Sequence, residues 1–293
     1  IFSKHIKNKR NRMLTTNILF SGILKIISLS TSLLIVPITI NYLNNEVYGI
    51  WMTISSMLFW ISTFDIGLGN GMRNYLTKSI SENNLPLGQK YISTTLTLLS
   101  LIAIALGLLL LIPLFTINFN VFFNTYAINN VDLRNALFVA LAFTLLNFVT
   151  KNIGLIFVAM QKYAINDLLA VLGNITSLTI IYILTKTTSS NLLYVILAYT
   201  VTQCIVYIFA AIPLFTKHKQ LRPNFHCFDW SLSKQIVGKG LGFFSIQISS
   251  CLIIFGAANV FIAQSCGPTA VTTYNIAYKF FNLIIIAYTI ILS

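Results

Sequence analysis

The chain has 293 residues, of which 56% are hydrophobic and only 9% are charged, and its formal net charge is +13. Soluble domains carry about 25% charged residues, so this composition excludes an ordinary soluble domain and predicts a protein built for lipid. A basic balance also occurs in nucleic-acid-binding proteins. These need a basic soluble face, and we therefore expect no nucleic acid as a partner.

Apolar runs long enough to cross a bilayer as helices, about 20 residues each, occur eight times along the chain. Irregular backbone cannot face lipid, so the sequence predicts an all-α fold, a polytopic bundle of about eight transmembrane helices. The connections 66–90, 118–134 and 216–236 are too long for tight turns and are interpreted as loops. The predicted spans are about 16–41, 47–65, 91–117, 135–160, 164–185, 191–215, 237–263 and 271–292.

Lys and Arg are distributed unequally between the two predicted sides of the membrane. The N-terminal tail, the loops 66–90 and 216–236, and Lys162 carry nearly all of them, whereas the opposite side holds only Arg134 and Lys186. Positive residues favour the cytoplasmic side. We therefore expect a cytoplasmic N-terminus. The first apolar run is too long for a signal peptide and is interpreted as a retained helix.

The first predicted hairpin carries aromatic residues at its outer end, and Tyr42, Tyr48 and Trp51 are interpreted as interfacial anchors.

A short stretch follows the second span, in which Asp65 precedes three glycines at alternate positions and then Arg73. A nucleotide-binding loop would need a strand before it and a Lys-Ser pair, and both are missing. The glycines instead predict a sharp exit from the helix and close helix packing. Asp65 is expected to pair with Arg73 or to cap the next helical piece. The glycines are Gly67, Gly69 and Gly71.

Three lysines, Lys25, Lys151 and Lys279, fall near the middle of predicted spans. A central lysine costs about 2.5–3.5 kcal/mol on insertion scales, so such residues should face a bundle interior or a wet cavity. The placement of Lys151 assumes that 135–160 is one helix. Acidic residues stay in loops or, like Asp65 and Asp167, at helix ends. The pattern favours an anionic substrate, and the alternative for each lysine is a structural pairing with backbone carbonyls.

Two segments, Tyr42–Trp51 and Asp65–Gly71, resemble the O-antigen and polysaccharide flippases of the multidrug/oligosaccharidyl-lipid/polysaccharide exporter superfamily. The segments Ala159–Tyr163 and Tyr274–Lys279 resemble the family more loosely. The resemblance covers essentially the whole chain. It implies a fold like that of the MATE transporters, with twelve or more helices in two lobes of six.

The resemblance also implies a function. Such proteins move undecaprenyl-diphosphate-linked oligosaccharides from the inner to the outer leaflet of the bacterial plasma membrane by alternating access. Their cationic central cavity would contain Lys25, Lys151 and Lys279, and Arg73 would steer the diphosphate. Tyr48 and Gly49 belong to the first motif and are expected to be structural. Expected partners are the lipid-linked oligosaccharide, membrane lipid, and polysaccharide polymerase and chain-length proteins. The sugars would contact polar faces at Ser21, Ser28, Ser32, Gln247, Ser250 and Asn259.

The predicted helix count falls short of the family pattern, so the chain is expected to be truncated. Residues 1–215 would form the first six-helix lobe, 216–236 a cytoplasmic linker, and 237–293 two helices of a second lobe. An inactive truncated remnant therefore remains an alternative.

Two further functions remain open as alternatives. One is a drug or cation antiporter of the same fold, which would need a titrating acid within the membrane. The other is a membrane enzyme acting on lipid-linked sugar, for which the outer loop offers only Asp132 and Arg134. We expect no enzyme activity and no cofactor, because the sequence offers no catalytic constellation. We also expect no metal, because four scattered cysteines without a Cys-x-x-Cys pair indicate structural thiols. They are Cys204, Cys227, Cys251 and Cys266.

Overall fold

The computed structural model describes residues 2–65, 67–238 and 257–292, with side chains for residues 20–62, 64–65, 67–238, 258–282 and 284. Within these ranges the chain consists of helices joined by turns, which confirms the predicted all-α class. The helices are α1 (Phe2–Leu43), α2 (Asn45–Thr63), α3 (Leu68–Ser81), α4 (Leu85–Thr116), α5 (Phe119–Phe123), α6 (Asn130–Thr150), α7 (Asn152–Ala159), α8 (Tyr163–Thr187), α9 (Leu192–Lys217), α11 (Ala257–Cys266) and α12 (Pro268–Leu292).

Five helical segments in the described residues are long and apolar enough to cross a membrane, which confirms a multi-pass membrane protein. Helix α2 has 19 residues and α12 has 25. The predicted span 237–263 lies mostly outside the described residues, as do Gln247, Ser250 and Cys251. The total of eight spans therefore stays a prediction. The five segments are Phe20–Leu43, Leu85–Thr116, Asn130–Ala159, Tyr163–Thr187 and Leu192–Lys217.

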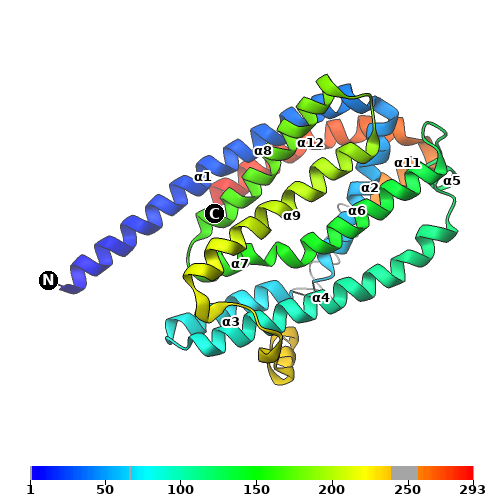
Figure 1. The fold of residues 1–293 in the computed structure, drawn as a ribbon. Helices are drawn as coiled ribbons and strands as arrows, with labels where there is room; N and C mark the ends of the chain where they lie inside the picture. The colour runs from blue at the N-terminus through cyan, green and yellow to red at the C-terminus, as the bar shows by residue number, and fades with distance from the viewer. Residues whose placement is uncertain (1, 66, 239–256, 293) are drawn as a thin grey trace.

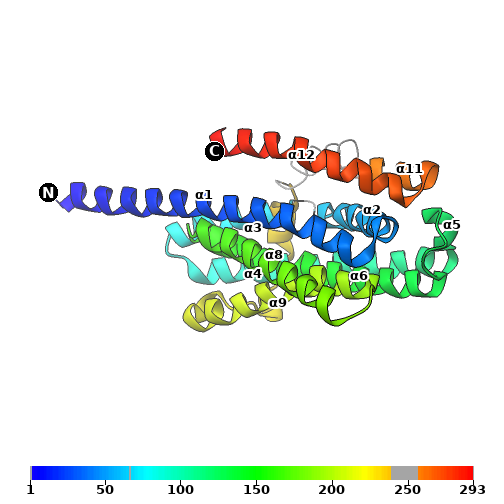
Figure 2. The same ribbon diagram turned by 90° about the horizontal axis from the view of Figure 1, so that it is seen from above.

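The helices form layers, and the bundle has two distinct ends. Helices α11 and α12 lie on one side, α1 and α2 lie next to them, and α4, α6 and α9 lie on the other side (Figure 2). Helix α3 and the 3₁₀ turn η1 (Lys219–Leu221) mark one end of the bundle, here called the α3 end. The opposite end contains α5 and the turns at Asn44 and Gly267, and is called the α5 end (Figure 1).

Contacts between distant segments close the α5 end. The Tyr42 hydroxyl donates to the Ser189 carbonyl at 2.8 Å. The Thr272 hydroxyl of α12 donates to the Asn45 carbonyl at 2.6 Å, which ties α12 to the start of α2. Thr125 also bonds to the Glu46 carboxylate. These bonds satisfy polar groups where the loops meet, so the first hairpin is fixed to the rest of the bundle.

The interpretation of Tyr42, Tyr48 and Trp51 as interfacial anchors is wrong. All three are buried, and Tyr48 exposes only 1% of its surface. The ring of Trp51 packs against that of Tyr199 on α9, with centroids 4.9 Å apart. These residues form part of the core, because the end of α2 is surrounded by α1, α6, α9 and α12 rather than by lipid.

The predicted loops at 66–90 and 118–134 contain helices. Residues 68–81 form α3, whose apolar side chains Leu68, Met72 and Leu76 recur every four residues and are buried. This spacing is that of an amphipathic helix, and Asn74, Lys78 and Ser81 of the same segment are exposed. Helix α4 begins at Leu85, with Asn84 as its cap. Residues 119–123 form the short helix α5, and α6 begins at Asn130.

The predicted span 135–160 is divided at one residue. Helix α6 ends at Thr150, Lys151 is a turn residue, and α7 begins at Asn152. The Lys151 amide still donates to the Asn147 carbonyl at 2.9 Å, so the two helices continue along nearly the same path. Lys151 therefore occupies a break within the span rather than the middle of one regular helix.

Residues 216–238 are attached to the start of α4. The Asn224 amide donates to the Ser93 hydroxyl at 3.0 Å, and the Asp229 amide donates to the Thr94 hydroxyl at 3.1 Å. The segment contains η1, the turn η2 (Phe225–Cys227), and a helical stretch at 230–238. It is thus an ordered strap across the α3 end. The division of the chain into lobes stays a prediction.

We predict that Gly49→Ala destabilises the protein, because a Cβ at Gly49 would overlap the backbone carbonyl of Pro268. Overpacking of this kind costs about 1–3 kcal/mol, and backbone cannot move aside as a side chain can. The measurement is thermal unfolding of the purified protein in detergent. Gly22→Ala is the matched control, since a Cβ at Gly22 meets nothing within 4 Å. Equal unfolding temperatures for the two variants would contradict the close approach of α2 and α12.

Candidate functional site

A pocket that contains a lysine lies between α1, α2 and α12. Its volume is about 160 Å³, and Lys279 of α12 is its charged residue. Ser32 of α1 and three further polar residues of α12 complete the polar lining, whereas the other lining side chains are apolar. The lining is Leu29, Ser32, Leu33, Met52, Asn275, Tyr278, Lys279 and Asn282. Here Lys279 meets the predicted requirement that a membrane lysine face a cavity.

Buried amides hold the helices around this pocket. The Asn275 side-chain amide donates to Oδ1 of Asn259 at 2.9 Å and to the Val271 carbonyl at 2.8 Å. Asn259 in turn donates to the Met52 carbonyl at 3.5 Å, a long bond. Helices α2, α11 and α12 therefore share one polar chain. Because the surroundings are apolar, such bonds have few competing partners and fix the relative position of the helices.

Lys279 was predicted from the sequence, whereas the neighbouring polar residues Asn275, Tyr278 and Asn282 of α12 were missed, although their spacing was readable there. Asn275, Tyr278, Lys279 and Asn282 lie three, four and seven residues apart, which places them on one helix face. Each sits in an otherwise apolar segment. A polar stripe within a membrane span is by default a pathway or site, so the stripe predicts the pocket that the structure shows.

Lys25 lies on α1, seven residues before Ser32 and four before Leu29, so these residues share a helix face. Its side chain is exposed. Helix α1 also packs on α8, where the Asn174 side chain donates to the Ser28 hydroxyl at 3.4 Å. The structure thus places Lys25 and Lys279 on neighbouring helices, with the pocket beside the α1 face that carries Lys25.

Lys151 contacts a different part of the protein. Its Nζ donates to the Ser62 carbonyl near the end of α2 at 3.0 Å, and lies 5.5 Å from the ring centroid of Phe148. Asp65 also acts on it electrostatically. A cation near the C-terminal carbonyls of a helix is favourable, because the helix dipole is negative there. These contacts correspond to the alternative interpretation, a lysine paired with backbone carbonyls.

Asp65 and the glycines form the junction between α2 and α3. Oδ1 of Asp65 accepts the Gly67 amide at 3.0 Å, which matches the expected capping role. Gly67 has φ +67°, a left-handed conformation that glycine adopts without strain. A Cβ at Gly69 would overlap the Asn152 side chain of α7, and one at Gly71 would lie 3.0 Å from Ile236. Close helix packing at these glycines is therefore confirmed.

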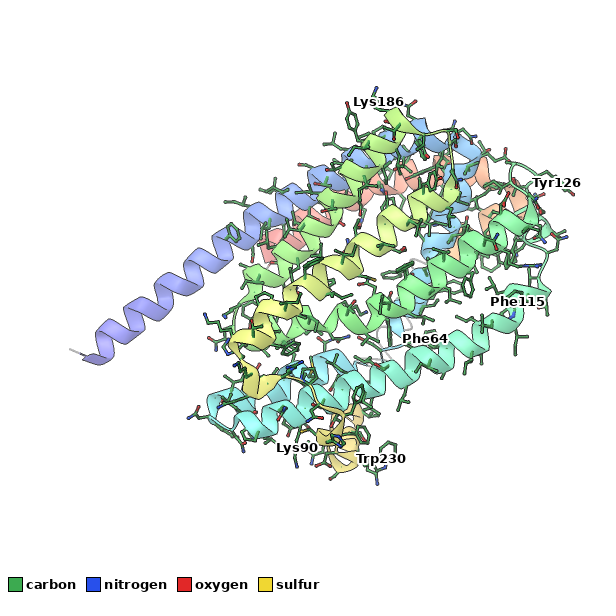
Figure 3. The ribbon with its side chains drawn as sticks, in the orientation of Figure 1. Phe64, Lys90, Phe115, Tyr126, Lys186 and Trp230 are labelled. Atoms are coloured by element: carbon green, nitrogen blue, oxygen red, sulfur yellow. The ribbon has the colours of Figure 1, made fainter. Side chains whose placement is uncertain are left out.

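Arg73 lies on α3, at the α3 end, and its guanidinium reaches Asn74 Oδ1 at 3.5 Å. The predicted pairing of Asp65 with Arg73 does not appear among the ion pairs of the described residues. Most Lys and Arg side chains gather at this same end, whereas Arg134 and Lys186 lie at the α5 end. Figure 3 shows Lys90 and Lys186 at the two opposite ends. The side of the membrane predicted for each of these Lys and Arg residues from the sequence thus corresponds to one end of the bundle.

The described part of the α1–α2–α12 pocket contains no carboxylate, and no group of three His, Cys, Asp or Glu side chains gathers in the described residues. The described cysteines, Cys204, Cys227 and Cys266, are free thiols. Chemically, the pocket offers an ammonium, amides and hydroxyls. Such a set binds an anion that also carries hydrogen-bonding groups.

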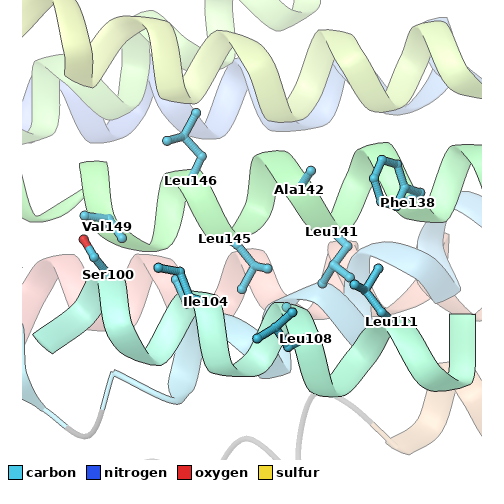
Figure 4. Close-up of a pocket in the computed structure, with 12 residues that line it drawn as sticks. Ser100, Ile104, Leu108, Leu111, Phe138, Leu141, Ala142, Leu145, Leu146 and Val149 are labelled. Carbon is cyan, nitrogen blue, oxygen red and sulfur yellow. The ribbon is translucent and has the colours of Figure 1, made fainter.

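A second cavity is apolar and faces outward between α4 and α6. Its volume is about 450 Å³, and it runs along one face of each helix, from Ser100 to Leu111 and from Phe138 to Val149 (Figure 4). The hydroxyl of Ser100 is bonded to the Leu96 carbonyl at 2.8 Å, so the groove presents no unpaired hydroxyl. It can hold hydrocarbon but offers nothing to a charged group.

A family model described as "Polysaccharide biosynthesis protein" matches residues 14–293. No curated protein matches the chain.

Several solved structures share the fold. A multidrug resistance MATE family transporter of the MOP superfamily, in an inward-facing conformation, has a TM-score of 0.71 at 19% identity, covering 88% of this chain and 61% of that one. A multidrug resistance MATE family transporter in an outward-facing conformation has a TM-score of 0.69 at 18% identity, covering 94% of this chain and 61% of that one. A MOP superfamily transporter from Pyrococcus furiosus has a TM-score of 0.69 at 18% identity, covering 92% of this chain and 60% of that one. The chain therefore spans about three fifths of these proteins.

We predict that Asp65→Ala lowers the free energy of unfolding by about 1–3 kcal/mol, because the Gly67 amide loses its charged acceptor in a buried turn. Asp65→Asn keeps an oxygen at the same position and should retain most of the stability. Thermal unfolding in detergent measures both. Equal losses in the two variants would show that the carboxylate charge beside Lys151, and not the bond to Gly67, stabilises the junction.

Proposed function

The chain belongs to the polysaccharide biosynthesis protein family, and on this premise we propose that it moves undecaprenyl-diphosphate-linked oligosaccharide across the bacterial plasma membrane by alternating access. The family match and the fold of MOP superfamily transporters support a membrane transporter. The oligosaccharide, such as an O-antigen unit, and the diphosphate carrier are parts of the proposal. So is the activity itself, since the chain spans about three fifths of the matched structures.

The observation that carries this proposal is the lysine-containing pocket between α1, α2 and α12. Lys279 supplies a positive charge beside amides and hydroxyls, and no described carboxylate lines the pocket. A diphosphate brings negative charge, and an ammonium in a low-dielectric pocket attracts it strongly. Sugar hydroxyls both donate and accept hydrogen bonds, which amides such as Asn282 can match. Lys25 would add a second cation from α1.

The concentration of Lys and Arg at the α3 end supports a cytoplasmic position for that end and for the N-terminus. Arg73 on α3 belongs to this basic end. A field of one sign at the mouth of a pathway raises the local concentration of an oppositely charged substrate. We therefore place the substrate's approach at this end. Polymerase and chain-length proteins would act on the product at the other side.

The position of α11 and α12 supports the proposed mechanism of alternating access. Both pack on α2, and α12 also touches α1, so the pocket lies where the proposed first lobe meets the start of the second. The bonds at Asn45 and Glu46 close the α5 end. A rocking motion of the lobes would have to break those bonds to release substrate there. Lys151, bonded to Ser62, would fix the first lobe rather than contact substrate.

A drug or cation antiporter is the second candidate function, because the matched structures include multidrug resistance transporters. That function needs a carboxylate that titrates within the membrane. The Pyrococcus furiosus structure is described by a reverse polarity of its binding pocket that suggests a different function. Pocket polarity thus separates functions on this fold, and a lysine pocket favours an anion. Transporters as relatives also support a role without catalysis.

We predict that neutralising Lys279, which lines the pocket, together with Lys25 on α1 strongly reduces export. The variant Lys25→Gln/Lys279→Gln should reduce surface polysaccharide at least about tenfold in a strain lacking its own O-antigen flippase, since each lost ionic hydrogen bond costs about 1.5–3 kcal/mol. The measurement compares surface polysaccharide at matched membrane protein levels. Both the 293-residue chain and a version extended to the length of the matched structures are tested.

The control for this experiment is Lys186→Gln, which removes a lysine at the α5 end, beside Tyr182 and away from the pocket. It should export normally. Normal export by the double variant would show that Lys25 and Lys279 do not bind substrate. Failure of the unmodified extended version in matched sugar backgrounds would instead overturn the proposed substrate class. The result for the short chain shows whether 293 residues suffice.

A further inference from the structure

A basic cavity lies at the α3 end, between the C-terminus of α9 and the start of α4. Its volume is about 390 Å³. Residues of α4 and α9 and of the turn η1 form it, so it is separate from the pocket between α1, α2 and α12. Its lining is Leu85, Thr216, Lys217, His218, Lys219, Gln220 and Leu221.

The lysines of this cavity have no carboxylate partner in the part of the chain that the structure describes. The ion pairs found there join Lys78 to Glu82 and Lys90 to Asp229. Lys217 and Lys219 belong to neither pair. Both side chains are exposed and line one cavity, where an anion would reduce the repulsion between their like charges.

His218, which lines the same cavity, has a buried ring nitrogen, Nε2, without a hydrogen-bond partner among the described residues. Burial, together with the neighbouring charges of Lys162 and Lys217, lowers the pKa of His218. Lys162 directly precedes α8, whose N-terminus has no side-chain cap. The positive end of that helix dipole adds to the charge around His218. An anion in the cavity would accept a hydrogen bond from Nε2 and would offset the positive charge around His218.

The surroundings of the cavity are those of a lipid headgroup site. Helices α4 and α9 both qualify as membrane spans, so the cavity lies where their ends leave the apolar layer. On α9, Phe209 and Ile212 expose 66% and 55% of their surface within about two turns of the cavity. Acyl chains would contact these side chains while the headgroup reached the lysines. Basic pockets between membrane helices bind anionic headgroups in this way.

We propose that this cavity binds the phosphate of an anionic phospholipid headgroup, through Lys217, His218 and Lys219. The site does not depend on the proposed transport function, because none of its residues lines the α1–α2–α12 pocket. The lipid would anchor the junction between α9 and the strap 216–238 to one membrane face.

The test counts lipids bound to the purified chain by native mass spectrometry, with phosphatidylglycerol and phosphatidylcholine offered separately. The wild type should bind phosphatidylglycerol in preference. Lys217→Gln/His218→Gln/Lys219→Gln should weaken this binding about fivefold for each lysine removed. The control Lys78→Gln/Lys234→Gln removes two lysines from the same end outside the cavity, and it should bind as the wild type does.

The outcomes are distinct. Equal phosphatidylglycerol binding by the triple variant and the wild type overturns the proposal, and so does a wild type that binds the two lipids equally. If the triple variant fails to fold, Lys219→Gln and the lipid preference of the wild type decide in its place. Inorganic phosphate added to the wild type distinguishes the two sources of phosphate. Binding of phosphate alone, with displacement of the lipid, supports the site but assigns it to free phosphate.

Discussion

The close approach of α2 to α12, where Gly49 lies against the backbone of Pro268, is the contact on which the arrangement of the pocket depends. Without a side chain at Gly49, the two helices come close enough for Thr272 to bond the Asn45 carbonyl. In lipid, where the hydrophobic effect does not drive helices together, small residues at such contacts supply the attraction through packing. The amides of Asn259 and Asn275 then fix α11 against the same pair.

Helix α2 is also held at its other end, by a quite different interaction. Lys151 bonds the Ser62 carbonyl, and Asp65 turns the chain into α3 through the Gly67 amide. Both use charged groups to satisfy backbone that would otherwise be unpaired at a helix end. The break between α6 and α7 places Lys151 in this position. The free-energy cost of burying the Lys151 ammonium is thus offset by the Ser62 carbonyl, the ring of Phe148 and the carboxylate of Asp65.

The cations of this protein therefore occupy three environments with different consequences. Lys151 is engaged by the protein itself. Lys279 faces a pocket that offers only neutral partners. Lys217 and Lys219 lie at the membrane boundary without carboxylates among the described residues. Each environment predicts a different occupant: none for the first, a transported anion for the second, and a lipid phosphate for the third. All four residues are lysines, so their surroundings separate their roles.

The sequence alone indicated the fold class, the distribution of charge and the polar face of α12. Apolar run length determined the all-α membrane class, because only a helix satisfies every backbone group in lipid. The unequal distribution of Lys and Arg, the missing membrane carboxylates and the stripe from Asn275 to Asn282 were all visible there. The spacing of Leu68, Met72 and Leu76 also indicated α3, although length and charge favoured a loop.

The tertiary structure alone decided which partner each residue meets. Periodicity identifies the face of a helix that a side chain occupies, but not the helix that lies opposite. For that reason Tyr48 and Trp51 matched interfacial anchors by position and yet are core residues, packed beneath α9 and α12. For the same reason Lys151 and Lys279 looked alike along the chain. One meets the carbonyl of Ser62, 89 residues away, and the other meets a cavity, because contacts between distant segments arise only when the helices pack.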